Sequence, residues 1–237
     1  EFEFFIPFLK IKLYFFKNKY KSLCSEISYN EKFVYFASPA QPEATTIPAA
    51  LENYNLILSL KILRSLLPKD IGIVYKENPS IFETRNPYIS AVAFKAKDYF
   101  EELNSIKGLK LVNTNYSSFD LVKKSIAVAT INGTVAIEAA ALNKKAFIFA
   151  SNWYEKIPGI YKIQDIKNIY KIIKNPLSLD ELNDRKKIYF DEKLIFEFKT
   201  HNPYINNDIP TSELICKYLY ALNKFRNFKE NDSKWLI

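Results

Sequence analysis

The sequence predicts an α/β fold, a Rossmann-like doubly wound parallel sheet with helical additions at its N- and C-terminal ends. First, short apolar segments alternate with helical segments between residues 30 and 162. Second, these apolar segments are continuous, as in strands that are covered on both faces. Third, the chain has 237 residues and 48% hydrophobic content, which is enough apolar material for one large core or two small ones.

The first half of this region alternates strand and helix. Residues 32–38 (KFVYFAS) form a run rich in β-formers that ends at a proline-containing loop, and residues 51–67 repeat apolar residues at helical spacing. Residues 71–76 (IGIVYK) predict a second strand. The segment 94–106 is helical and stops before a glycine, and LKLVN at 109–113 predicts a third strand.

The second half continues the alternation. Ser117 or Ser118 can cap the short helix FDLVKKS, because a serine oxygen accepts a hydrogen bond from a free amide at a helix start. The strands IAVAT (126–130) and AFIFA (146–150) bracket the helical segment 134–144. The resulting order is βαβαβαβαβ, which favours a parallel sheet.

Both ends of the chain differ from this pattern. We assign residues 1–29 to an N-terminal helical segment, 30–162 to the Rossmann-like domain and 163–237 to a C-terminal helical region. The most apolar stretch, residues 2–16, contains lysines and a proline and is shorter than the roughly 20 residues of a membrane span. It also lacks the features of a signal peptide, so it predicts a buried or interfacial helix. The C-terminal helices are expected at residues 166–175, 178–198 and 211–225.

Charge and composition exclude several kinds of site. With 34 Lys and Arg against 26 Asp and Glu, the net charge of +8 favours nucleotide phosphates, other polyanions or an acidic membrane surface as partners. Cys24 and Cys216 lack the spacing of a zinc site or a disulfide framework, which fits a reducing cytoplasm. The single histidine, His201, has no partners for a hydrolase triad. The loops described next lack the paired acidic residues that suit Mg²⁺, so we expect no metal.

Three loops carry unusual chemistry at the edge of the sheet where ligands bind, beyond the carboxyl ends of the strands. They are residues 38–48 (SPAQPEATTIP), 76–88 (KENPSIFETRNPY) and 130–134 (TINGT). In the first loop, Gln41 and Glu43 flank a proline and suit the orientation of a polar ligand, or the segment is a plain surface loop.

The second and third loops contain candidate phosphate ligands. In the second loop, Lys76 can pair with phosphate oxygens as a point charge and Pro79 stiffens the backbone around Asn78; alternatively, Lys76 is a solvated charge and the rest is a turn. In the third loop, Gly133 allows a close backbone approach, while Thr134 supplies a hydroxyl beside amides with partial positive charge.

The third loop leads into a segment with a possible sugar ligand. Glu138 lies on the same helix face as Thr134, where its carboxylate can accept hydrogen bonds from a sugar diol. The alternative is that Asn132 and Gly133 form a tight turn and that Thr134 caps the helix. After the last predicted strand, Trp153 and Tyr154 can stack on a base or form an aromatic plug under the loop.

Taken together, these segments resemble the bacterial capsule polysaccharide biosynthesis family, which includes Kdo transferases. The matching stretches are VYFASPAQPEATT for a strand and Q-P-E loop, VYKENPS for a strand and K-E-H-P, and VATINGTVAIEAAALNKKAFIFASNWY for a GT-x-x-x-E helix, a strand and W-Y. The resemblance covers residues 32–163. It implies the GT-B arrangement of two facing Rossmann-like domains, of which this chain contains one.

The resemblance implies a metal-independent glycosyltransferase without a separate cofactor. Its donor is a nucleotide sugar, most often CMP-linked, and its product is a capsule or lipopolysaccharide glycan. By position, Glu43 is the candidate catalytic residue, the second and third loops hold phosphate, and Glu138 contacts the nucleotide sugar. The residues assigned to donor binding are Gln41, Lys76, Asn78, Pro79, Asn132, Gly133, Thr134, Glu138, Trp153 and Tyr154.

The chain departs from the family in two respects. Asn78 stands where the family has a histidine; asparagine can donate a hydrogen bond to phosphate, but it cannot carry a positive charge or shuttle a proton. In addition, only about thirty residues precede the first strand, whereas an acceptor-binding domain needs roughly 100 to 200. We therefore expect the acceptor half to lie outside this sequence.

These inferences define the expected partners and two alternatives. We expect a nucleotide-sugar donor, a glycan or lipid-linked acceptor and no nucleic acid, in the cytoplasm, with peripheral association at the inner membrane left open. One alternative is a non-catalytic basic module that holds an acidic glycan or the membrane face, with strongly salt-dependent binding. The other is a nucleotide-sugar epimerase, although the sequence lacks the clustered histidines and carboxylates expected for its acid–base chemistry.

Overall fold

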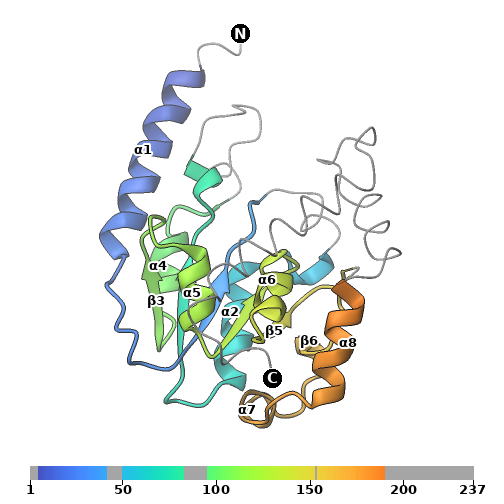
Figure 1. The fold of residues 1–237 in the computed structure, drawn as a ribbon. Helices are drawn as coiled ribbons and strands as arrows, with labels where there is room; N and C mark the ends of the chain where they lie inside the picture. Colours follow the sequence, from blue (N-terminus) through green and yellow to red (C-terminus); the bar gives the residue numbers. More distant parts are fainter. Residues whose placement is uncertain (1–4, 42–49, 83–94, 153, 190–237) are drawn as a thin grey trace, which may run out of the picture.

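The fold is a Rossmann-like α/β domain built on a six-stranded parallel sheet (Figure 1). The computed structural model describes residues 5–41, 50–82, 95–152 and 154–189. The strands lie in the order β3-β2-β1-β4-β5-β6, and every neighbouring pair is parallel. Their bounds are β1 Phe33–Ala37, β2 Gly72–Lys76, β3 Leu109–Val112, β4 Ala127–Thr130, β5 Lys145–Ile148 and β6 Ile160–Lys162.

The predicted fold class is confirmed, and the sheet has one strand more than we predicted. All five predicted strands form within about two residues of the expected positions. The sixth strand, β6, has three residues and pairs with β5 from Ala146 to Ile148. So short a segment gives no apolar run that could be recognised without its neighbour, so the sequence pattern did not reveal it.

Helices cover both faces of the sheet. Their bounds are α1 Phe5–Leu23, α2 Leu56–Leu66, α4 Tyr99–Asn104, α5 Ser118–Lys124, α6 Val135–Ala141, α7 Ile169–Lys174 and α8 Leu179–Tyr189, with 3₁₀ turns η1 Leu51–Tyr54, η2 Pro79–Phe82 and η4 Ile163–Asp165. Ser117 caps α5, as predicted, because its hydroxyl accepts a hydrogen bond from the Asp120 amide. The expected helix at 211–225 lies outside the described residues. In the described part of the chain, no helix has the length and hydropathy needed to cross a membrane.

The predicted helix at 51–67 is divided in two. Residues Leu51–Tyr54 form the 3₁₀ turn η1, and α2 begins at Leu56. Asn55 separates them, because its side chain accepts a hydrogen bond from the Leu58 amide and caps α2. An asparagine in an extended conformation therefore starts the helix five residues later than the apolar spacing indicated.

The alternation of side chains along each strand divides the core into two apolar clusters, one on each face of the sheet. On one face, Phe36 and Tyr75 pack with the apolar residues of α2 and α4, and Tyr20 of α1 joins them. On the other face, Tyr35 and Val74 pack with α5 and α6. The N-terminal helix therefore shares the core of the sheet, beside α4 and the β3 edge.

A buried arginine attaches α8 to the rest of the domain. Arg185 is 2% exposed, and its guanidinium donates hydrogen bonds to the carbonyl oxygens of Ala140 (3.0 Å), Lys144 (3.1 Å) and Pro158. These carbonyls belong to the end of α6, the turn that follows it and the segment before β6. Gly159 lies directly under the guanidinium, with a φ of +86°. The last helix among the described residues, α8, is thus joined to the second half of the sheet by the Arg185 side chain.

Candidate functional site

The strand order places the three predicted loops at neighbouring positions on one edge of the sheet. The chain runs from β1 outward to β2 and β3, then returns to β4 on the other side of β1. In such sheets the ligand crevice lies at this switch point, outside the carboxyl ends of β1 and β4. The loops after β1 and β4 flank the switch point, and the loop after β2 is one strand away, about 4.8 Å.

Thr130, at the end of β4, links the two loops that flank the switch point. Its hydroxyl donates a hydrogen bond to the carbonyl oxygen of Ala37 at the end of β1 (3.1 Å) and accepts one from the Gly133 amide (3.2 Å). The hydroxyl proton and one oxygen lone pair are thus directed by neighbouring backbone. The sequence analysis had not singled out this threonine, because nothing local shows that the end of β1 lies beside it.

Glycine is required at position 133 by close packing, with no unusual backbone angle involved. A Cβ atom there would lie 2.8 Å from Thr130 Oγ1, which is closer than real Cβ contacts allow. The carbonyl oxygen of Gly133 accepts a hydrogen bond from the Tyr154 hydroxyl (2.8 Å), and that of Asn132 accepts one from Asn152 Nδ2 (2.9 Å). The carbonyls of this loop are therefore satisfied from inside the protein.

The same loop leaves donor groups unpaired at the switch point. Within the described residues, the backbone amides of Thr134 and Val135 donate no hydrogen bond. Thr134 occupies the N-cap position of α6, but its side chain makes no capping hydrogen bond and is exposed. Because α6 has only seven residues, its helix dipole is small. The Thr134 and Val135 amides would therefore contribute to ligand binding mainly as individual hydrogen-bond donors.

Glu138 is a half-buried carboxylate without a partner. In the described part of the chain it forms no hydrogen bond or ion pair, and burial raises the pKa of its carboxyl above the usual value. It lies near the hydroxyl of Tyr35, whose pKa is raised to about 12, first by burial and further by the charge of Glu138. Burying a carboxylate without a partner costs free energy, so this residue is not explained by stability.

This arrangement predicts that Glu138→Gln stabilises the protein at neutral pH. A carboxyl whose pKa is raised on folding holds its proton more tightly in the folded state, so stability falls as the pH rises above the ordinary value of about 4.5. Removing the charge should raise the unfolding temperature at neutral pH, and the gain should vanish in acid. Thermal unfolding of both proteins from acid to neutral pH measures this difference in unfolding temperature. The control is the same substitution at the exposed Glu31. A lower unfolding temperature at neutral pH would show that the carboxylate has a stabilising partner.

Lys76 extends from the end of β2 to the start of α5. Its ammonium donates hydrogen bonds to the carbonyl oxygen of Tyr116 and to Ser118 Oγ, both at 2.7 Å. The residue is buried, and desolvation lowers the pKa of the ammonium. The solvated-charge interpretation is therefore wrong, because this lysine is held in place. An ammonium has three hydrogens, so one remains for a ligand oxygen.

The side-chain amide of Asn78 is held through its oxygen. Its Oδ1 accepts hydrogen bonds from the Ser80 amide (3.0 Å) and the Ser80 hydroxyl (2.9 Å), which fixes the orientation of the side-chain amide. Its Nδ2 donates no hydrogen bond within the described residues. Pro79 follows, exposed, as the first residue of η2. The asparagine thus offers a neutral donor at this position.

The remaining predicted residues divide into three groups. Gln41 Nε2 donates to the carbonyl oxygen of Tyr54 (2.7 Å) and joins the first loop to η1. Tyr154 is fully buried under the third loop, so the stacking prediction is wrong for this residue and the aromatic plug is the observed arrangement. Glu43 and Trp153 lie outside the described residues, and their roles stay predictions.

The structure also brings in residues that the sequence analysis did not single out. Thr130 joins the two loops of the switch point, and Ser118 holds Lys76. Glu77, between Lys76 and Asn78, is fully buried and was passed over because a charged residue in a loop usually faces water. No group of three or more His, Cys, Asp or Glu residues within the described ranges could hold a metal ion.

Of the comparisons with known proteins, only the one with solved structures found similar proteins. No family model matches the chain, and no curated protein sequence matches it. KpsC of Thermosulfurimonas dismutans, a β-Kdo 2,7 transferase, is 16% identical over 73% of this chain and 51% of that chain, with a TM-score of 0.45. A UDP-GlcNAc 2-epimerase from Neisseria meningitidis is 15% identical over 88% of this chain and 49% of that chain, with a TM-score of 0.40.

The wall teichoic acid polymerase TagF is also similar to this chain. It is 15% identical over 88% of this chain and 48% of that chain, with a TM-score of 0.33. The chain therefore spans about half the length of each of these three proteins.

Proposed function

We propose that this chain is the nucleotide-sugar-binding half of a glycosyltransferase that acts in capsule or lipopolysaccharide synthesis, with a CMP-linked sugar as donor. One observation carries the proposal. At the switch point, a single loop and helix combine unpaired amides at Thr134 and Val135 with the unpaired, half-buried carboxylate of Glu138. A nucleotide sugar needs this combination, because its phosphate accepts hydrogen bonds and its sugar hydroxyls donate them.

Each group has a defined chemical role in this proposal. The two amides, the Thr134 hydroxyl and Asn78 Nδ2 donate to phosphate oxygens, while the ammonium of Lys76 supplies positive charge. Glu138 accepts hydrogen bonds from a sugar diol. As the glycosidic bond breaks, negative charge grows on the leaving nucleotide, and donors that are already in place stabilise it. Glu43 is proposed as the catalytic residue, and a glycan or lipid-linked molecule at the inner membrane face as the acceptor.

Thermal unfolding with added nucleotides tests the proposal. CMP, UDP, GDP and ADP are compared at millimolar concentration, each at low and moderate salt. A nucleotide at one hundred times its Kd should add about 2.7 kcal/mol to the stability, which raises the unfolding temperature by several degrees. We expect a selective increase with CMP that persists in salt. Thr134→Val should abolish most of it, because the exposed hydroxyl is lost without a change in the core.

The same substitution at a second threonine provides the control. Thr114 lies after β3, two strands from the switch point, so Thr114→Val should leave the CMP effect unchanged. An equal response to all nucleotides that vanishes with salt would contradict a built phosphate site. That result would favour the alternative of a basic module, because binding through scattered lysines is screened by ions.

A further inference from the structure

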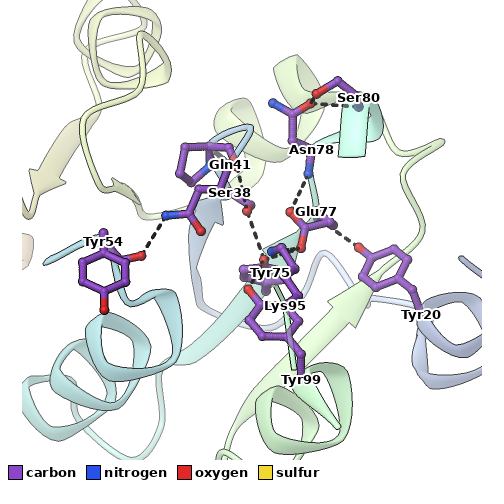
Figure 2. A network of polar contacts seen from close by, with 11 residues as sticks. Tyr20, Ser38, Gln41, Tyr54, Tyr75, Glu77, Asn78, Ser80, Lys95 and Tyr99 are labelled. Carbon is purple, nitrogen blue, oxygen red and sulfur yellow. Dashed lines mark hydrogen bonds and ion pairs between the residues drawn. The ribbon is translucent and has the colours of Figure 1, made fainter. Parts of the chain in front are cut away.

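Glu77 is a fully buried carboxylate at the end of β2, with polar contacts to groups from several elements (Figure 2). Its Oε2 accepts hydrogen bonds from Lys95 Nζ (3.0 Å) and from the Tyr75 hydroxyl (2.8 Å). Its Oε1 accepts one from the backbone amide of Asn78 (3.0 Å). Both carboxylate oxygens are thus engaged, and one of them directly holds Asn78 in the loop that follows β2.

The partners of Glu77 extend the network to α1 and α4. The Glu77 amide donates to the Tyr20 hydroxyl (2.9 Å) from α1. The ammonium of Lys95 also lies 4.0 Å from the ring centre of Tyr99, the first residue of α4. The carboxylate and ammonium are 0% and 5% exposed, so the pair is shielded from bulk solvent.

The network also reaches the loop after β1. Tyr75 Oη lies 3.0 Å from Ser38 Oγ, the first residue beyond β1, and 3.2 Å from Tyr99 Oη. Figure 2 shows dashed contacts that run from Ser38 to Tyr75, from Tyr75 to Glu77 and from Glu77 to Asn78. The Glu77 carboxylate therefore contacts the loop after β2 directly and reaches the start of the loop after β1 only through Tyr75.

Stability alone does not account for this arrangement. A buried ion pair loses much hydration, and replacing both members by apolar residues of similar volume is often neutral or stabilising. What apolar residues cannot supply is an acceptor for the Asn78 amide. Without that acceptor, the Asn78 amide is left unpaired, and the one described backbone hydrogen bond that remains at Asn78 runs from the Ile81 amide to its carbonyl oxygen (3.2 Å).

We propose that Glu77, neutralised by Lys95, is a positioning residue for nucleotide binding. It fixes the backbone of Asn78, so that the side-chain amide of Asn78 faces the donor phosphate with its nitrogen. This role rests on the proposed function, because it assigns a purpose to the orientation of Asn78. Glu77 itself does not touch the ligand.

Two double variants test the proposal without leaving an unpaired buried charge. Glu77→Met with Lys95→Met removes the acceptor, whereas Glu77→Gln with Lys95→Met keeps an oxygen that can accept from the Asn78 amide. The control is Lys61→Met with Glu102→Met, an exposed pair at 2.7 Å on α2 and α4. The measurements are hydrogen–deuterium exchange of residues 77–82 and the Kd for CMP.

We expect the first double variant to increase amide exchange at Asn78 and Ser80 about tenfold and to weaken CMP binding about tenfold, as for one lost hydrogen bond. The glutamine variant should restore most of the slow exchange and most of the CMP affinity, because it keeps an acceptor for the Asn78 amide. If Glu77 only stabilised the fold, this recovery would not be expected. The exposed control pair should change neither.

The outcomes separate this inference from the proposed function. Unchanged exchange in the first variant would overturn the positioning role, whatever the nucleotide result. Faster exchange with unchanged CMP affinity would overturn the link to binding. If the unaltered protein binds no nucleotide, the proposed function fails, and the exchange measurement still decides whether Glu77 orders the loop.

Discussion

Replacing Lys95 alone by methionine is expected to lower the unfolding free energy by about 3–5 kcal/mol. The substitution leaves Glu77 fully buried without its counter-charge, and the penalty is that of the unpaired carboxylate more than of the lost pair. Adding Glu77→Met should recover most of the loss, because the second change removes the orphaned charge. The two changes are therefore expected to be strongly non-additive.

Urea denaturation of the single and double variants measures these free energies. The comparison holds if the slope of the unfolding free energy against urea concentration is the same in all variants. Lys61→Met serves as the matched control, because Lys61 also pairs with a glutamate but is 53% exposed. Such a surface pair contributes about 1 kcal/mol or less. If Lys95→Met cost no more than Lys61→Met, the pair would be accessible to water, in conflict with its burial.

Gly159→Ala is expected to destabilise the protein by about 3 kcal/mol or more. A Cβ atom at this position would lie 1.8 Å from Arg185 Nη2, so the guanidinium must leave its three carbonyl partners. The φ of +86° adds strain for any residue with a side chain. The expected consequence is detachment of α8 from the segment before β6.

The matched control is Gly72→Ala, where an added Cβ meets nothing closer than 3.5 Å and φ is not positive. This change should cost little, because alanine is at least as favourable as glycine in a strand. In an Arg185→Ala background, Gly159→Ala should cost only the backbone strain, about 1–2 kcal/mol. Chemical denaturation of the four variants checks this, and equal costs of Gly159→Ala in both backgrounds would rule out the proposed clash.

The fold class could be predicted because its signals are local. Continuous apolar runs such as 32–38 and 71–76 occur where both faces of a strand are covered, and a helical repeat follows each of them. The cap of α5 was narrowed to Ser117 or Ser118 for the same reason, since a cap and its amide are three residues apart, and the structure shows Ser117. The three-residue strand β6 gave no such signal and was missed.

The candidate site could be predicted only in part. Gly133, Thr134 and Glu138 were selected because one loop and the following helix place them together, and the structure shows the expected free donors and carboxylate there. Tyr154 was open between two interpretations, since an aromatic residue after a strand can face the ligand or the core. Its burial under Gly133 is decided by packing between segments about twenty residues apart.

The sequence by itself determined the alternation of strands and helices and the three loops that carry polar side chains. Those features depend on residues within a few positions of each other, where hydrogen bonding and apolar spacing act directly. Only the tertiary structure decided that β4 lies beside β1, so that Thr130 meets Ala37, and that Glu77 meets Tyr20 and Lys95. Contacts between distant segments depend on how the whole sheet packs. No local sequence pattern indicates which groups a buried charged side chain will contact.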